Sequence, residues 1–142
     1  MKTATNLLAT KSATIFSVKA NTSVLDALQL MMEKNISALL IMEDEVLSGI
    51  FTERDYARKI ILQGRSSKDT QISEVMTSEV LTLSPADGID QCMEIMTRQH
   101  IRHLPIVDSN KVVGIISIGD LVRFVIEEQK KTIEHLESYI SS

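Results

Sequence analysis

The sequence contains few of the residues that mark several common protein classes. Cys92 is the single cysteine among 142 residues, and tryptophan is absent. One cysteine excludes an internal disulfide framework and a cysteine-rich metal site. Aromatic residues make up 4% of the chain, which argues against stacking platforms for single-stranded nucleic acid.

Charge and hydropathy exclude two further classes. Fifteen basic residues against nineteen acidic ones give a net charge of −4, and sequence-independent nucleic-acid binding needs a basic surface. No apolar run approaches the roughly 18 residues of a membrane span, and the first residues lack the pattern of a signal peptide. With 44% hydrophobic residues the chain can bury a core, so we expect a globular cytoplasmic protein that binds neither nucleic acid nor membranes.

The chain repeats itself at an offset of 65 residues. Gly49 and Gly114 correspond at this offset, and so do Asp55 and Asp120. Further matching pairs are Met31/Met96, Ile36/Ile101, Leu39/Leu104, Ile41/Ile106 and Arg58/Arg123. Two copies of one supersecondary unit explain these matches most simply.

Each copy has the pattern of a β-α-β-β-α unit of about 48 residues. So small a unit buries too little surface by itself. We therefore predict an α+β fold in which two repeats pack sheet against sheet with approximate two-fold symmetry. The predicted boundaries are an N-terminal lead 1–13, a first repeat 14–63, a connector 64–78, a second repeat 79–127 and a C-terminal helical extension 128–142.

The last helix is predicted to run from about Asp120 to Ile140. Its apolar stripe consists of Val122, Val125, Ile126, Gln129, Ile133, Leu136 and Ile140. Such a stripe needs something to bury it. Packing on its own domain and packing on a second chain remain equally open.

Two equivalent strings could carry chemistry: Gly49 to Asp55 and Gly114 to Asp120. Each has a glycine, two apolar residues, a hydroxyl, two variable positions and an aspartate, where a strand leads into a helix. Backbone N–H groups at a helix start attract anions, and a carboxylate can accept hydrogen bonds from the vicinal hydroxyls of a ribose. The same Thr/Ser-x-x-Asp pattern is also an ordinary helix capping box that needs no ligand.

These two strings, with the repeat, resemble a tandem pair of cystathionine-β-synthase (CBS) domains over about residues 12 to 127. The segment Ile101 to Asp108 and the pair Met76-Thr77 are also typical of that family. The resemblance implies a regulatory module that binds adenosine nucleotides in clefts between the two copies.

The resemblance implies two related nucleotide pockets. In the first, Asp120 would hold the ribose, with Ile115, Ser117 and Gly119 beside it, and the adenine would be lined by Thr22, Ile36, Ser37 and Ala38. In the second, Asp55 would hold the ribose, with Ile50, Thr52 and Arg54 beside it, and Val80, Leu81 and Ile101 would face the base. The phosphate contacts would be Arg102 and His103. Since the first copy has Ser37-Ala38 at the positions of Arg102-His103, the pockets cannot be equal, and Arg54 would supply a cation that Gly119 cannot.

We compare three functions for this sequence. The leading one is a non-catalytic sensor of AMP, NAD or ATP that signals to an effector protein through rearrangement of a homodimer. The alternative is a ligand-independent module for homodimerisation. An enzyme is disfavoured because the sequence has no nucleophile–base pair, paired acids or metal cluster at usable spacing. We therefore expect no catalytic residue, no metal and no cofactor other than the bound nucleotide.

Overall fold

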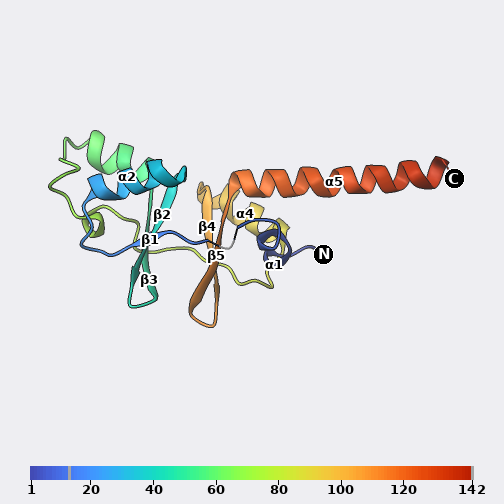
Figure 1. Ribbon diagram of the computed structural model, residues 1–142, viewed down its shortest axis with the longest axis horizontal. Coiled ribbons are helices and arrows are strands. Elements are labelled where there is room, and N and C mark those ends of the chain that lie inside the picture. Colours follow the sequence, from blue (N-terminus) through green and yellow to red (C-terminus); the bar gives the residue numbers. More distant parts are fainter. Residues whose placement is uncertain (13, 142) are drawn as a thin grey trace. The chain divides into compact units, whose positions relative to one another are not determined.

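The computed structural model describes residues 1–12 and 14–141, which form two compact units. The first-repeat unit consists of residues 14–81 and 108–112. The second-repeat unit consists of residues 1–12, 82–107 and 113–141. Both contain helices and a small sheet, as the α+β prediction requires (Figure 1).

The first-repeat unit is built on a three-stranded sheet. Its elements are β1 (Ser17–Val18), α2 (Val24–Lys34), β2 (Ala38–Glu43), β3 (Val46–Thr52), α3 (Glu53–Tyr56), a π-helix (Ala57–Ile61) and a 3₁₀ turn (Ile72–Glu74). The central strand β2 runs parallel to β1 and antiparallel to β3. Residues 38–41 of β2 are all buried, and α2 covers the face that carries Leu39 and Ile41 with Val24, Ala27 and Met31.

Local signals determine where α2 begins and ends. The Ser23 hydroxyl accepts a hydrogen bond from the Asp26 backbone N–H at 3.0 Å, which is the usual N-terminal cap. Asn35 ends the helix in the left-handed conformation, with φ of 54°. His100 ends the equivalent helix of the second repeat in the same conformation, with φ of 55°.

The second helix of the first repeat differs from its prediction. The sequence predicts one helix from Thr52 to near Gly64, but α-helical geometry ends at Tyr56 and a π-helix follows. The backbone N–H of Leu62 therefore bonds to the carbonyl of Ala57 at 3.0 Å, five residues back. The segment does end at Gly64, whose φ of 63° a glycine adopts without strain.

The second-repeat unit has a smaller sheet and a longer helix. Its elements are α1 (Ala4–Leu8), α4 (Ile89–Gln99), β4 (His103–Asp108), β5 (Lys111–Ser117) and α5 (Ile118–Ser141). The predicted first strand of this repeat is reduced to one parallel bridge between Leu83 and Ile106. Pro85 follows closely, and proline cannot donate to a strand ladder.

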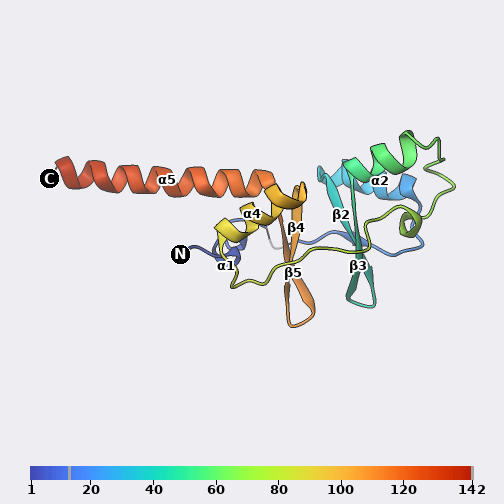
Figure 2. The same ribbon diagram turned by 180° about the vertical axis from the view of Figure 1, so that it is seen from behind.

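Residues 1–12 take part in the core of the second-repeat unit. Leu7 of α1 is 1% exposed and α1 contacts both α4 and α5 (Figure 2). The buried cluster comprises Ala4, Leu7, Ile89, Cys92, Met96, Leu104, Ile106, Ile116, Leu121 and Phe124. Cys92 is completely buried.

The last helix, α5, covers the length that the sequence predicts, beginning two residues earlier, at Ile118. No helix in the described part of the chain is long and apolar enough to cross a membrane.

Candidate functional site

The first candidate site lies where β3 leads into α3. The Asp55 backbone N–H donates to the Thr52 hydroxyl at 3.2 Å, and the Thr52 backbone N–H donates to Asp55 Oδ2 at 3.0 Å. This reciprocal pair is the capping box that the sequence predicts. Asp55 is only 8% exposed, so the capping box keeps a carboxylate inside the fold.

The other oxygen of Asp55 has partners that the sequence analysis did not identify. The Thr77 hydroxyl donates to Asp55 Oδ1 at 3.1 Å, and Lys59 Nζ lies 3.2 Å from the same oxygen. Lys59 also donates to the Val75 carbonyl at 2.9 Å. Thr77 is itself held against β3 by two backbone hydrogen bonds with Ile50.

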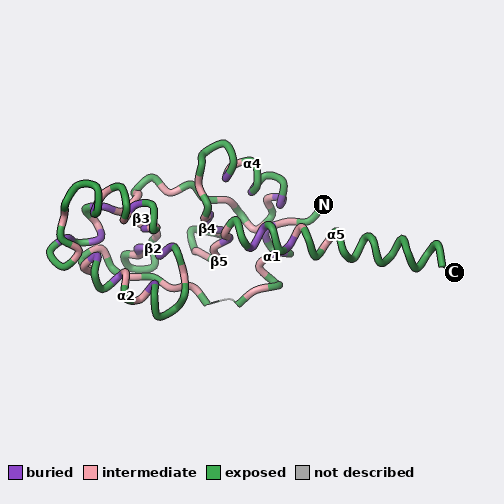
Figure 3. The backbone as a smooth tube through the Cα atoms, turned by 90° about the horizontal axis from the view of Figure 1, so that it is seen from above, coloured by how far each residue is buried: buried purple, intermediate pink, exposed green. Residues whose placement is uncertain are grey.

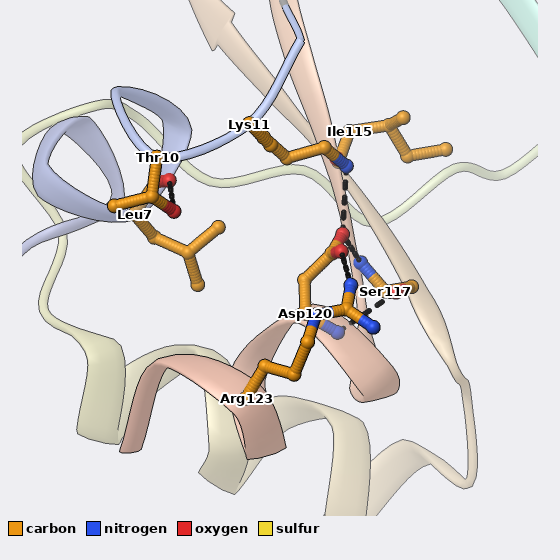
Figure 4. Close-up of polar contacts among 7 residues, drawn as sticks. All are labelled: Leu7, Thr10, Lys11, Ile115, Ser117, Asp120 and Arg123. Carbon is orange, nitrogen blue, oxygen red and sulfur yellow. Dashed lines mark hydrogen bonds and ion pairs between the residues drawn. The ribbon is translucent and has the colours of Figure 1, made fainter. Parts of the chain in front are cut away.

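The second candidate site has the same box where β5 leads into α5 (Figure 4). The Asp120 backbone N–H donates to the Ser117 hydroxyl at 3.0 Å, and the Ser117 backbone N–H donates to Asp120 Oδ2 at 2.9 Å. Asp120 is 9% exposed. The two repeats therefore place a buried aspartate at the same strand–helix junction.

Two cations neutralise Asp120. Lys11 Nζ lies 2.7 Å from Asp120 Oδ2 and donates to the Ile115 carbonyl at 2.8 Å. Arg123 donates to Asp120 Oδ1 at 2.7 Å from an exposed side chain (Figure 4). Burial alone raises the pKa of Asp120, but the hydrogen bonds from Lys11 and the Ser117 backbone outweigh it, so the pKa lies below 3.8. Asp120 is therefore ionised at neutral pH.

Each site also has a backbone contact from the loop before its hairpin. The Glu53 N–H donates to the Ser37 carbonyl at 3.3 Å, and the Ile118 N–H donates to the Arg102 carbonyl at 2.9 Å. These two bonds are equivalent at the 65-residue offset. They place Ser37 and Ala38 beside the Asp55 box, and Arg102 and His103 beside the Asp120 box.

The His103 side chain is half-buried in the second-repeat unit. Burial is the main reason why its pKa lies below 6.5, and the nearby Arg102 and Lys11 lower it further against the opposing charge of Asp120. His103 is therefore neutral at pH 7 and can donate one ring N–H to an anion without carrying a charge.

The remaining predicted site residues differ in exposure. Ser37, Arg54, Leu81 and Gly119 are exposed; Thr22, Ile36, Val80, Ile101 and Ile115 are half-buried; Ala38 and Ile50 are buried. Each predicted pocket combines residues of the first-repeat unit with residues of the second-repeat unit. The grouping of these residues into two pockets stays a prediction.

Sequence reasoning missed the side chains that bind the two aspartates, and one signal could have found them. Extending the 65-residue offset to the N-terminus pairs Leu7 with Ile72, and both are buried. The same offset pairs Lys11-Ser12 with Met76-Thr77. The segment before the first strand of the first repeat supplies Lys11 to Asp120. The segment before the first strand of the second repeat supplies Thr77 to Asp55.

The chemical groups around the two boxes are suited to binding. Within residues 1–12 and 14–141, His, Cys, Asp and Glu side chains form no group of three or more that could hold a metal ion. Burial raises the pKa of the Cys92 thiol, so this side chain is a poor nucleophile at neutral pH. The two boxes offer oriented carboxylates and hydroxyls, which suit hydrogen bonding to a polyhydroxylated ligand.

Comparison with known proteins identifies the class. The CBS domain model matches residues 10–62 and 72–127, so the chain belongs to the CBS domain family and carries two copies of the domain. It is 42% identical over 123 residues to the CBS domain-containing protein CBSX3, mitochondrial, of Arabidopsis thaliana. That match covers 83% of this chain and 60% of the plant protein.

Solved structures agree with the family assignment. A CBS-domain protein of Burkholderia ambifaria MC40-6, whose name links it to signal transduction, has a TM-score of 0.87 at 47% identity, covering 90% of this chain and 96% of that one. The CBS domain pair of protein MJ0100, solved with 5-methylthioadenosine and S-adenosyl-L-methionine, has a TM-score of 0.80 at 26% identity, covering 90% and 98%. The chain is thus a CBS domain pair, a regulatory type of module.

Proposed function

We propose that this CBS domain pair is a non-catalytic sensor that binds an adenosine-containing nucleotide such as AMP, NAD or ATP. The observation that carries the proposal is the buried aspartate at the same strand–helix junction of both repeats, 8% exposed at Asp55 and 9% at Asp120. Each carboxylate is oriented by its capping box, so it can accept hydrogen bonds from the two hydroxyls of a ribose. The adenosine-derived ligands of the related MJ0100 pair support this choice of ligand.

Binding would require an exchange of partners at each aspartate. At Asp55 a ribose hydroxyl would replace the Thr77 hydroxyl, a neutral donor. At Asp120 it would compete with Lys11 and Arg123. Exchange of a hydroxyl for a hydroxyl leaves the charge balance unchanged, whereas displacing a lysine from a buried carboxylate is costly. We therefore propose that the Asp55 site has the higher affinity and that Lys11 must move when the Asp120 site fills.

The phosphates would lie near Arg102 and His103. Arginine offers a bidentate fork to phosphate, and the neighbouring neutral imidazole can donate another hydrogen bond. A bound nucleotide would favour one arrangement of a dimer, which an effector protein would detect. We also propose that the protein is cytoplasmic and that it binds neither nucleic acid nor membranes.

Calorimetry and thermal shift with AMP, ADP, ATP, NAD and S-adenosylmethionine test the proposal. Ligand at 100 times its Kd stabilises the folded state by about 2.7 kcal/mol, which corresponds to a melting-point rise of several degrees. We expect Asp55→Asn to abolish the tighter binding event and Asp120→Asn the weaker one. The asparagine retains a capping oxygen, so both variants should remain folded by circular dichroism.

Asp108→Asn is the matched control, since Asp108 is exposed at the end of β4. It should bind like the wild type. No shift with any of the five compounds would refute the nucleotide proposal, and unchanged affinity in both aspartate variants would refute the assignment of the sites.

A ligand-independent assembly module is the second candidate function, and the exposed apolar face of α5 favours it. Light scattering with and without nucleotide distinguishes the two. A strict monomer under both conditions would eliminate the assembly function. A dimer whose formation depends on nucleotide would show that the chain both binds nucleotide and assembles.

A further inference from the structure

The second half of α5 has no support within the described part of the chain. All residues from 129 to 141 are exposed (Figure 3), whereas Leu121 and Phe124 at its start are buried. A free helical segment of about 12–15 residues is marginal in water. Residues 129–141 continue a helix whose first half is packed, and a second element that covers their apolar face would stabilise them.

Five exposed apolar residues of α5 follow a heptad repeat, and two others, Ile118 and Tyr139, lie beside it at g positions. Ile126, Ile133 and Ile140 occupy one core position (a), and Val122, Gln129 and Leu136 occupy the other (d). Their spacing alternates four and three residues over the whole stretch. The apolar members are well exposed, from 45% for Ile126 to 82% for Ile140. Apolar residues at a and d form the seam of a coiled coil, so the matching occupant is another helix with the same repeat.

We propose that α5 pairs with α5 of a second copy of this chain in an antiparallel two-stranded coiled coil. The proposal does not depend on nucleotide binding. The proposed seam begins at Val122 and continues beyond residue 127, where the match to the CBS domain model ends.

Charge at the flanking positions determines the orientation. The e positions are Arg123, Lys130 and Glu137, and the g positions are Val125, Thr132 and Tyr139. A parallel pair brings g residues opposite e residues, and because no g residue is charged, no ion pair would form. An antiparallel pair brings e residues opposite e residues, so Arg123 of each copy, which also binds Asp120 of its own chain, faces Glu137 of the other. The two copies of Lys130 meet between these ion pairs, where their long side chains can extend apart into solvent.

The antiparallel register also pairs the core residues. With Arg123 facing Glu137, Val122 packs against Ile140, Ile126 against Leu136, and Gln129 against Ile133. The overlap runs from residue 122 to 140, which is the exposed stretch of the face. A slip by one heptad would leave apolar residues unpaired at both ends. In one direction it would bring Arg123 against Lys130, and in the other it would replace the Arg123–Glu137 pairs by Lys130–Glu137 pairs over a shorter seam. The amide of Gln129, one polar group in an apolar seam, further disfavours other registers.

Cysteine cross-linking in the full-length chain tests the register. The test uses Ile126→Cys alone, Leu136→Cys alone, and an equimolar mixture of the two, unfolded and refolded together and then mildly oxidised. In the antiparallel pair the thiol introduced at position 126 of one copy faces the thiol introduced at position 136 of the other, so disulfide-linked dimer forms in the mixture. Equivalent cysteines lie ten residues apart along the axis, about 15 Å at 1.5 Å per residue, beyond the ~7 Å Cα limit of a disulfide.

The control replaces Ile126→Cys by Lys131→Cys in the mixture. Lys131 is exposed but lies at the outward f position, so the control mixture should not cross-link. Native Cys92 is buried, and the wild type reports any background from it. Cross-linked dimer in the Ile126/Leu136 mixture alone supports the proposal. Cross-linking of either single variant would show a parallel pair, and absence of cross-linking throughout would show that α5 does not pair in this register; both results overturn the proposal.

Discussion

At the scale of single residues, the partners of Asp55 and Asp120 make two similar boxes chemically different. Lys11 and Arg123 surround Asp120 with positive charge, whereas Asp55 shares its Oδ1 between Lys59 and the Thr77 hydroxyl. A buried carboxylate is costly unless it is paired and hydrogen-bonded. Both aspartates are therefore part of the folded structure whether or not a ligand binds.

The lowered pKa of Asp120 predicts how stability depends on pH. Because the folded-state pKa lies below the ordinary 3.8, the ionised carboxylate stabilises the fold above that value. This contribution is lost as pH falls below 3.8 through the folded-state pKa. We expect Asp120→Asn to lower the free energy of unfolding by about 2 kcal/mol at pH 7, the scale of hydrogen bonds to a charged group.

Urea unfolding from pH 7 to pH 3 measures the effect. The wild type should lose more stability than Asp120→Asn over the acidic part of the range, so the two curves converge. Asp108→Asn should stay parallel to the wild type. Parallel curves for Asp120→Asn and the wild type would contradict the role given to the charge.

At the scale of elements, two short segments perform the same task in different units. Leu7 of α1 and Ile72 of the 3₁₀ turn are 65 residues apart, and each is at most 1% exposed in the core of its own unit. Leu8 lies against Gly114, where an added Cβ would come within 2.5 Å of a Leu8 methyl group. This close approach explains why a glycine occupies that position in β5.

Leu7→Ala and Ile72→Ala form a matched pair of core truncations. Each should reduce the free energy of unfolding by about 2–5 kcal/mol, since each removes a fully buried aliphatic side chain. Leu62→Ala is the control, because Leu62 is 78% exposed and should change stability by less than about 0.5 kcal/mol. Chemical denaturation measures all three, and a change at Leu7 no larger than the control would show that α1 does not pack as described.

At the scale of the whole molecule, the two units are not continuous stretches of the chain. Residues 1–12 precede the first repeat yet belong to the second-repeat unit. They complete its core with Ala4 and Leu7 and neutralise Asp120 with Lys11. The N-terminal segment is thus a structural part of the second CBS domain.

Deleting residues 1–12 should destabilise the second-repeat unit selectively. Hydrogen exchange should show faster exchange in α4 and β5, while β2 and β3 keep their protection, because local stability follows local packing. Full-length protein measured under the same conditions is the reference. Equal loss of protection in both units, or no loss in either, would contradict the division into units.

Much of the fold and of the site follows from the sequence alone. The 65-residue repeat, the α2 and α4 helices, both hairpins and the two capping boxes depend on residues three or four apart or on short periodic patterns. The α5 helix follows for the same reason. The π-helix after Tyr56 departs from those patterns because π-type hydrogen bonds have no local sequence signal. The reduced first strand of the second repeat departs from the repeat pattern at Pro85, which has no counterpart in the first repeat.

The tertiary structure alone brings Thr77 and Lys11 to the two aspartates, whereas Lys59 and Arg123 lie at helical spacing from them. Thr77 reaches Asp55 across 22 positions and Lys11 reaches Asp120 across 109, and no local pattern relates residues so far apart. Only the folded core, in which α1 packs into the second-repeat unit, brings those donors to the carboxylates. The sequence therefore determines that each repeat has a capping box with an aspartate. The packing of distant segments determines that Asp120 receives a lysine and Asp55 a neutral hydroxyl.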